Sequence, residues 1–265
     1  MHMTLIGANA AGLGNKIDSL HRLVSKFNPA AILIQETKAR RKNVFKIDNY
    51  ECFELPRNNS NGGGLFTAIH KSLNPVESST DSDQEILVVE ASVHGRLIRF
   101  INGYGPQEYA SEDIRKQFFN QLDLEVKKSF QAGALIVIEM DSNAKLGPRL
   151  LPADPKAQSE NGKLLEQVIT ENNLIIVNSQ PLCTGAITRY RKTVRSEESS
   201  ILDHFLVCED MFEFVKSMIV DETGINSLTK YSSKTGSQTV VKESDHRTIL
   251  PGVYILPNAP PNGVE

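Results

Sequence analysis

The chain has 265 residues, of which 40% are hydrophobic, and it is long enough to bury the core of one large α/β domain. Its formal net charge of −3 excludes a uniformly basic nucleic-acid-binding protein, and the three widely spaced cysteines, Cys52, Cys183 and Cys208, argue against a disulfide framework or a zinc site. The sequence contains no run of about 18 apolar residues and no secretory signal pattern, so we expect an intracellular protein that neither spans a membrane nor is secreted.

The first three elements are predicted to alternate strand, helix, strand. Residues 4–8 form a short apolar strand that ends at Asn9, and the apolar spacing over residues 17–27 predicts an amphipathic helix that stops at Asn28 and Pro29. Residues 30–34 form a buried strand that ends in Gln35 and Glu36. A crossover of this length makes the two strands parallel, so we expect Asn9 and Glu36 at the same edge of a sheet.

The next stretch predicts short strands at residues 62–70, 86–93 and 96–101, which we interpret as one antiparallel meander with a tight turn at His94 and Gly95. Tyr104 follows the last of these strands. Residues 112–130 predict a helix that Ser111 caps, with Ile114, Phe118, Leu122 and Val126 as its inner face.

Residues 134–138 form an apolar, β-branched run, which predicts a buried strand that leads into Asp141 and Asn143. If the backbone stays extended, these two side chains project to the same side and can hold a water between them. The same residues, Asp-Ser-Asn, also suit a turn, and the sequence leaves both interpretations open.

The last part of the chain predicts a helix at residues 162–172 and a strand at 174–177, then a hairpin that runs out over 187–191, carries a charged tip at 194–199 and returns over 201–207. Asp203 lies within the returning apolar strand, where a carboxylate is costly unless it has a partner. Further strands are expected at 218–220 and 248–255, and Asp245 and His246 open the last one. Two sets of short strands with a few helices predict a two-sheet α/β sandwich over residues 1–256, followed by a linker-like tail at 257–265.

Polar residues that end or interrupt these strands make a chemically coherent set: Asn9, Glu36, Tyr104, Asp141, Asn143, Asp203, Asp245 and His246. Hydrolysis of a phosphodiester by a hard ion such as Mg²⁺ needs one or two carboxylates, for which Glu36 and Asp245 are the candidates. Asp141 with Asn143 would position the attacking water, and His246, Asn9 and Tyr104 are donors for the phosphate oxygens. Asp203 would orient the His246 ring and keep it protonated.

The chain resembles the endonuclease/exonuclease/phosphatase superfamily and, within it, the apurinic-type endonuclease domain of LINE-class (non-LTR) retrotransposons. The resemblance lies in an ordered set of segments that spans nearly the whole chain: residues 8–13, 34–37, 102–106, 141–143, 200–204 and 244–246. It implies a four-layer α/β sandwich (DNase I-like, exonuclease III-like) with two packed mixed β-sheets flanked by helices.

The resemblance also implies a Mg²⁺-dependent nuclease, with Mn²⁺ as a substitute, that nicks double-stranded DNA and leaves a 3′-hydroxyl that primes reverse transcription. It makes Glu36 the principal metal ligand, with Asp245 completing the site, and it implies a nuclear monomer with a reverse transcriptase domain in the same polypeptide. The hairpin residues Thr188, Arg189, Arg191, Lys192 and Arg195 would contact DNA.

Two positions depart from the family pattern. Met140 stands where the family has Gly before the aspartate, and a bulky side chain there is expected to narrow the site or to shift Asp141. Ala11 replaces a polar residue, which weakens the case for a second metal. The alternatives are therefore a phosphoesterase of the same fold acting on DNA ends, RNA or phospho-metabolites, or a catalytically impaired copy that only binds DNA.

Overall fold

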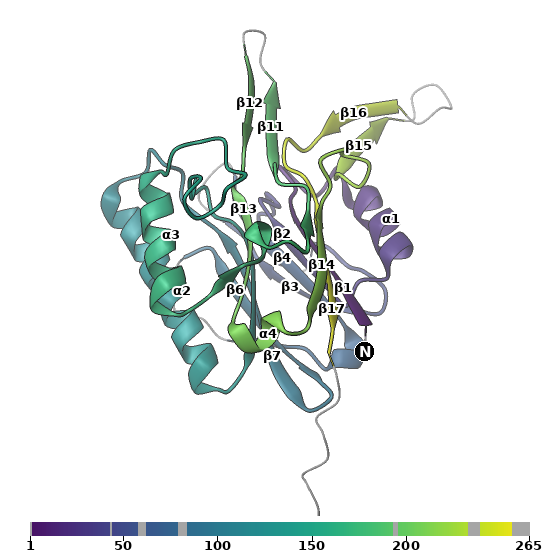
Figure 1. The fold of residues 1–265 in the computed structure, drawn as a ribbon. Helices are drawn as coiled ribbons and strands as arrows, with labels where there is room; N and C mark the ends of the chain where they lie inside the picture. The colour runs from purple at the N-terminus through teal and green to yellow at the C-terminus, as the bar shows by residue number, and fades with distance from the viewer. Residues whose placement is uncertain are drawn as a thin grey trace, which may run out of the picture.

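The structure, a computed structural model, describes residues 2–42, 44–57, 62–78, 84–192, 196–232 and 239–255. Within these ranges, a seven-stranded and a six-stranded mixed β-sheet pack face to face, with α1 on the outer side of the larger sheet and α2 and α3 on the outer side of the smaller one (Figure 1). The predicted four-layer sandwich is therefore confirmed. The predicted tail at 257–265 lies outside the described residues.

The seven-stranded sheet has the spatial order β10 (Cys183–Thr184), β14 (Val215–Val220), β17 (Ile249–Tyr254), β1 (His2–Asn9), β2 (Ala31–Gln35), β4 (Leu65–His70) and β3 (Tyr50–Leu55). The six-stranded sheet has the order β5 (Val76–Ser78), β6 (Ile86–Val93), β7 (Arg96–Tyr104), β8 (Leu135–Asp141), β13 (Asp203–Val207) and β9 (Ile175–Ile176). Two hairpins stand apart from the sheets: β11 (Arg189–Lys192) with β12 (Glu197–Ser200), and β15 (Thr229–Ser232) with β16 (Thr239–Glu243). The helices are α1 (Ile17–Phe27), α2 (Glu112–Gln131), α3 (Glu160–Glu171) and the short α4 (Glu209–Phe212), with 3₁₀ turns η1 (Lys71–Leu73) and η2 (Val177–Ser179). None of the helices in the described ranges is both long and apolar enough to cross a membrane.

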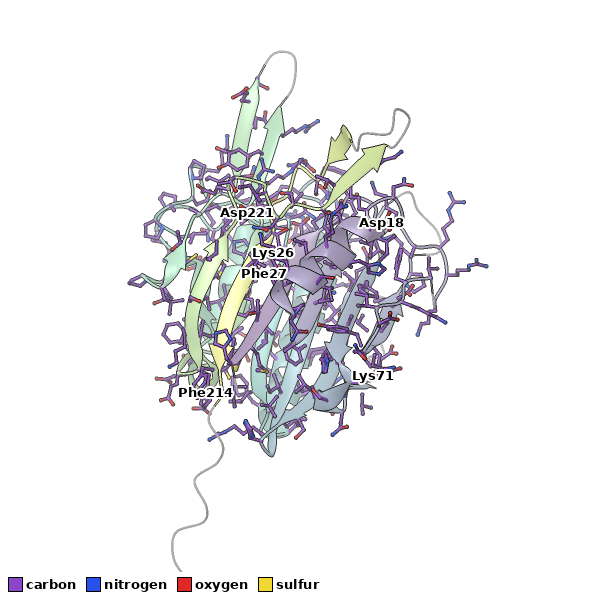
Figure 2. All side chains as sticks on the ribbon, turned by 90° about the vertical axis from the view of Figure 1, so that its right-hand side faces the viewer. Asp18, Lys26, Phe27, Lys71, Phe214 and Asp221 are labelled. Carbon is purple, nitrogen blue, oxygen red and sulfur yellow. The ribbon has the colours of Figure 1, made fainter. Side chains whose placement is uncertain are left out.

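The β1-α1-β2 unit follows the sequence prediction closely. α1 buries Leu20 and Leu23 and ends where Asn28 adopts a left-handed backbone conformation, a common way for a helix to stop. Figure 2 shows α1 lying across the outer face of the larger sheet, with Asp18 at one end and Lys26 and Phe27 at the other. β1 and β2 are parallel neighbours, and their register pairs Asn9 with Gln35. The strand ends that carry Asn9 and Glu36 therefore meet at one edge, as predicted.

The predicted antiparallel meander is wrong, because its strands belong to different sheets. β4 pairs with β2 and β3 in the larger sheet, whereas β6 and β7 form a hairpin in the smaller one. The chain crosses between the sheets through η1 and β5. Turn residues and apolar alternation identify strands but carry no information on which sheet each joins, so the periodicity alone did not reveal the crossing.

Two further predictions need correction. Ile114 is 50% exposed, because the buried stripe of α2 begins one turn later with Phe118 and Phe119 and continues through Leu122 and Val126. Residues 197–200, predicted mostly as hairpin tip, are the returning strand β12. The run predicted as the return contains β13, a separate strand of the smaller sheet that begins at Asp203.

Candidate active site

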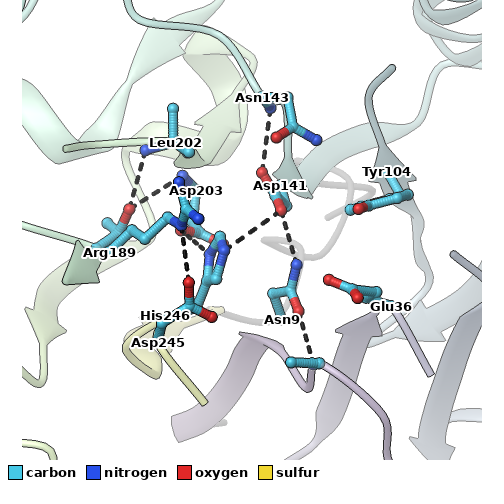
Figure 3. Close-up of polar contacts among 12 residues, drawn as sticks. Asn9, Glu36, Tyr104, Asp141, Asn143, Arg189, Leu202, Asp203, Asp245 and His246 are labelled. Carbon is cyan, nitrogen blue, oxygen red and sulfur yellow. Dashed lines mark hydrogen bonds and ion pairs between the residues drawn. The ribbon is translucent and has the colours of Figure 1, made fainter. Parts of the chain in front are cut away.

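The two sheets contribute one strand end each to a buried polar contact. Asn9 ends β1 of the larger sheet and donates a hydrogen bond of 2.7 Å from Nδ2 to Oδ2 of Asp141, which ends β8 of the smaller sheet. The backbone N–H of Asn143 donates to the other carboxylate oxygen, Oδ1, at 3.1 Å. Both oxygens of Asp141 are therefore held in fixed positions at the mouth of the sandwich (Figure 3).

The chain does not stay extended after Asp141. Asn143 has a left-handed backbone with φ of 48°, and its Nδ2 donates to the carbonyl of Gly105 at 2.9 Å. The turn interpretation is therefore the right one. Asn143 contacts Asp141 through its backbone N–H, whereas its carboxamide ties the loop to the end of β7.

Asp203 and His246 form the predicted contact. β13 pairs with β8 so that Asp203 stands opposite Asp141, and both carboxylates are buried. His246 Nδ1 donates to Asp203 Oδ2 at 2.8 Å, and its Nε2 lies 3.8 Å from Asp141 Oδ2. The imidazole therefore lies between two carboxylates, with its Nε2 side towards Asp141.

Charge and burial set the protonation of this pair. Burial alone lowers the pKa of His246, but the charges of Asp203 and then Asp141 outweigh it and raise that pKa to about 9. Burial raises the pKa of Asp141 to about 7, with the positive charge of His246 acting in the opposite direction. His246 is therefore a buried cation at neutral pH, beside a carboxyl group whose pKa burial holds above its ordinary value.

Thr188 supports Asp203 and does not face solvent. Its side chain is fully buried, and Oγ1 accepts the backbone N–H groups of Leu202 at 3.0 Å and Asp203 at 3.1 Å. The predicted DNA contact of Thr188 is therefore wrong, because its hydroxyl is occupied inside the protein. Thr188 fixes the strand start from which Asp203 reaches His246.

We expect Thr188→Val to lower the free energy of unfolding by about 1–3 kcal/mol, because two buried N–H groups lose their acceptor. Thr188→Ser keeps the hydroxyl and should lose much less. Denaturant unfolding measures both variants, and DNA affinity should stay the same in both. Equal stability of Thr188→Val and the unmodified chain would contradict this role.

Glu36 and Tyr104 lie on the other side of Asn9 from His246 (Figure 3). Glu36 follows β2 in a left-handed conformation with φ of 51°, a costly backbone for this residue that its neighbours maintain: its carbonyl accepts the N–H of Gly12 at 2.8 Å. Tyr104 ends β7 in register with Asp141. Burial, followed by the charges of Asp141 and Glu36, raises the pKa of Tyr104, which keeps it a hydrogen-bond donor.

The residues present fit a divalent cation at Glu36. The Glu36 side chain is 19% exposed, and the ammonium of Lys38 lies 2.9 Å from its Oε1, so a cation already pairs with this carboxylate. After burial, the negative charges of Asp141 and Glu36 are the main causes that raise the pKa of Tyr104, so two carboxylates act on this part of the site. A hard ion that takes carboxylate oxygens and waters matches this setting.

A second group, Asp141, Asp203 and His246, has ligand atoms within 4.8 Å of one another. Its atoms are already engaged, since Nδ1 of His246 bonds to Asp203 and the oxygens of Asp141 accept from Asn9 and Asn143. A protonated imidazole also has no lone pair for a metal.

Asp245, the second predicted metal ligand, is placed elsewhere. Its Oδ2 accepts from Nε of Arg189 at 3.0 Å, and Figure 3 places it on the far side of Asn9 from Glu36. Burial raises the pKa of Asp245, but the charges of His246 and Arg189 outweigh this effect and lower it. The structure therefore does not bring Glu36 and Asp245 together, because Arg189 holds the Asp245 carboxylate.

The prediction that Met140 narrows the site is wrong. Successive residues of a strand face opposite sides, and Met140 turns away from Asp141, towards α2, where Gly103 leaves room for it and Phe118 lies nearby. The site is not narrowed at this position.

Sequence reasoning missed Ser244, whose Oγ donates to the carbonyl of Asn9 at 2.7 Å and accepts the N–H of His246. Its place directly before Asp245 was the available signal.

The β11–β12 hairpin projects from the end of the molecule that carries the site (Figure 1). Arg191 is exposed on it, and Arg189 is partly exposed beside Asp245. Lys192 ends β11, whereas Arg195 lies outside the described residues. The contact of these cations with DNA stays a prediction.

Known structures share this architecture, although the sequence matches no protein-family model and no curated protein. The chain is similar to the endonuclease domain of TRAS1, a telomere-specific non-LTR retrotransposon, with a TM-score of 0.71 and 17% identity over 96% of this chain and 99% of that one. It is also similar to the AP endonuclease LMAP from Leishmania major, with a TM-score of 0.72 and 13% identity over 96% of this chain and 88% of that one.

The chain has the endonuclease/exonuclease/phosphatase fold. A third similar structure, the 3′ phosphatase NExo from Neisseria bound to a product DNA hairpin, has a TM-score of 0.69 and 17% identity over 94% of this chain and 98% of that one. The similarity covers nearly the whole chain and includes both sheets. At these identities, the endonuclease/exonuclease/phosphatase fold is what the comparisons establish, and the chemistry must be argued from the site itself.

Proposed function

We propose that this protein is a Mg²⁺-dependent DNA endonuclease of the retrotransposon type, which nicks double-stranded DNA and leaves a 3′-hydroxyl. The observation that carries the proposal is the buried chain Asn9–Asp141–His246–Asp203 beside the partly exposed carboxylate of Glu36. At one edge of the sandwich it combines a base, Asp141, a cation, His246, and a carboxylate that would bind the metal, Glu36. The similarity to retrotransposon and AP endonucleases supports DNA as the substrate.

Each residue then has a definite task. Asp141 holds the attacking water and takes its proton, because its pKa near 7 lets it act as a base at neutral pH. Water oxygen bonds to phosphorus, the bond from phosphorus to the 3′ oxygen breaks, and the leaving oxygen takes up a proton to become the 3′-hydroxyl. Cleavage at this bond leaves the phosphate on the 5′ end of the downstream strand.

The cationic face of the site stabilises the charge that builds on the phosphate. Nε2 of His246 lies 3.8 Å from Oδ2 of Asp141 and would donate to a phosphate oxygen there, and Asp203 keeps the ring charged and oriented. Tyr104 donates from the opposite side and stays protonated because of its raised pKa. Glu36 would hold Mg²⁺, which as a Lewis acid supplies further neutralisation of the phosphate oxygens.

In an intact element, the 3′-hydroxyl would prime reverse transcription by a polymerase domain of the same polypeptide, and the protein would act as a monomer in the nucleus. An impaired copy is disfavoured, because Met140 leaves the site open and the contacts of Asp141, Asp203 and His246 are complete. A phosphatase acting on DNA ends is the main competitor, since one similar structure is a 3′ phosphatase bound to a DNA hairpin.

Supercoiled plasmid tests the proposal. We expect conversion to open circles with Mg²⁺ and none with a chelator, and we expect His246→Ala to lose conversion. The product ends should be a 3′-hydroxyl and a 5′-phosphate. A protein that releases phosphate from a 3′-phosphorylated duplex but leaves the plasmid supercoiled would be the end-specific phosphatase instead.

We expect Arg191→Ala to weaken binding of double-stranded DNA similarly across sequences and to reduce the slope of log affinity against log salt by about 1. The reason is that Arg191 is exposed on the hairpin and none of the ion pairs described for the chain involves it. Lys116→Ala is the matched control, since this exposed cation lies on α2 and pairs with Glu112. An unchanged slope in Arg191→Ala would contradict docking through the hairpin.

A further inference from the structure

Gly7 and Glu139 form a second contact between the sheets, next to the contact between Asn9 and Asp141 and deeper in the sandwich. Gly7 lies two residues before Asn9 on β1, and Glu139 lies two residues before Asp141 on β8. Residues two apart on a strand share a face, so both pairs point into the space between the sheets. The glutamate therefore lies directly behind the catalytic pair, in the interior of the sandwich.

The two residues are complementary in size. A Cβ placed on Gly7 would lie 2.2 Å from Cδ and 2.3 Å from Oε1 of Glu139, far inside contact distance. The backbone of Gly7 has no positive φ, so its conformation does not demand glycine. Glycine is needed at position 7 because the Glu139 side chain fills the space where another residue would place its own.

Glu139 connects strands of both sheets through one hydrogen-bonded network. The side chain is 1% exposed, and Oε2 accepts from Nε2 of Gln35, which also donates to Oδ1 of Asn102 at 2.8 Å. Nδ2 of Asn102 in turn donates to the carbonyl of Phe66 at 3.0 Å and to Oγ1 of Thr67 at 3.1 Å. The network therefore links β8 and β7 of one sheet to β2 and β4 of the other.

Gln35 carries this contact to the site. It ends β2, pairs in register with Asn9, and immediately precedes Glu36. Glu139 thus joins the strand end that bears Glu36 to the strand that bears Asp141 two residues further on. Burial, followed by the charge of Asp203, raises the pKa of Glu139 well above its ordinary value, so a neutral amide is its closest mimic.

We propose that Glu139 is a positioning residue that, seated against Gly7, holds Gln35 and so sets the place of the Glu36 carboxylate relative to Asp141. This inference rests on the proposed function for the role of Glu36. It requires that losing the hydrogen bond to Gln35 weakens metal binding. Losses of outer partners of metal ligands commonly cost 10-fold to 100-fold in metal affinity.

The test compares Glu139→Gln, Glu139→Ala, Gly7→Ala and the double variant Gly7→Ala/Glu139→Ala. Mg²⁺ alone is the probe, and the readouts are the rise in melting temperature with Mg²⁺ and its half-saturating concentration. Glu54→Ala is the control, since this buried carboxylate on β3 binds the backbone N–H groups of Val44 and Phe45, two strands away from β2.

We expect Glu139→Ala to raise the half-saturating Mg²⁺ at least about 10-fold, whereas Glu139→Gln stays within about 3-fold of the unmodified chain. Gly7→Ala should lower the melting temperature through the clash. The double variant should recover that temperature but keep the weak Mg²⁺ response, which separates packing from positioning. Glu54→Ala should lower the melting temperature without changing the half-saturating Mg²⁺ concentration.

A Glu139→Ala protein that melts earlier yet responds to Mg²⁺ at the original concentration would overturn the proposal, as would an unmodified chain with no Mg²⁺ response. Failure of the proposed function looks different. A chain whose melting temperature rises with Mg²⁺ but which nicks no DNA refutes the nuclease, while the comparison among the Glu139 variants still decides the positioning role.

Discussion

Glu36→Gln is expected to reduce Mg²⁺-dependent nicking by at least about 10³-fold while leaving the fold intact. Of the two carboxylates predicted as metal ligands, Glu36 alone has no arginine partner, since Asp245 is held by Arg189. An amide keeps the shape of the side chain but removes the charge that attracts the ion. The loss should appear in the initial rate of plasmid nicking at saturating Mg²⁺ and in the melting shift with Mg²⁺ alone.

The stability of the variant should change by less than about 1 kcal/mol, because the Lys38 pair that Glu36 loses is partly exposed and such pairs contribute little. Glu77→Gln is a matched control, since this exposed glutamate on β5 also pairs with a lysine, Lys42, at 3.7 Å. Near-normal nicking by Glu36→Gln, or an equal loss in Glu77→Gln, would show that the ion is bound elsewhere.

The members of the site could be predicted because each ends or begins a strand. Apolar runs at residues 4–8, 30–34 and 134–138 lead to Asn9, Glu36 and Asp141. The corresponding ends of neighbouring strands lie at one edge of the packed sheets, so these side chains were expected to meet there. Asp203 was recognisable for a different reason. A carboxylate inside an apolar run requires a partner, and the structure supplies His246.

The contacts that orient these residues could not be predicted, because they depend on tertiary register. Thr188 looked like a hairpin residue, yet its hydroxyl is buried against the N–H groups of Leu202 and Asp203. The turn at Asn143 was one of two interpretations that the sequence allowed, and its carboxamide contact with Gly105 decides between them. Local composition does not specify partners that lie 38 residues away.

Sheet membership escaped prediction for a related reason. The run at 62–70 and the run at 86–93 have similar apolar patterns, but β4 lies in one sheet and β6 in the other. The pair Gly7 and Glu139 is a product of that arrangement, because the glycine and the glutamate face each other only when the sheets stack in this register. A glutamate within an apolar strand was the one visible sign of the buried network.

Asp203→Asn is expected to lower the nicking rate by about 10²–10⁴-fold at pH 7 and to move the alkaline limb of the pH profile to lower pH. In the unmodified chain the rate should rise as Asp141 ionises near pH 7 and fall as His246 loses its proton near pH 9. The charge of Asp203 is the main influence that raises the pKa of His246, so an amide at this position lets the ring lose its proton earlier. The acidic limb, which Asp141 sets, should move less.

The same linkage predicts a stability difference that depends on pH. Because the pKa of His246 is raised from 6.5 to about 9 on folding, the protonated ring stabilises the fold fully below about pH 6.5, and this contribution of the order of 3 kcal/mol is lost as pH rises through 9. Asp203→Asn removes most of it, so the stability gap between the two proteins should be largest near pH 6 and should close towards pH 10. Asp221→Asn, the control, removes a buried carboxylate bound to Thr223 and Asn226. Its stability difference from the unmodified chain should not close towards pH 10. An alkaline limb that stays near pH 9 in Asp203→Asn would mean that a group other than His246 supplies the positive charge.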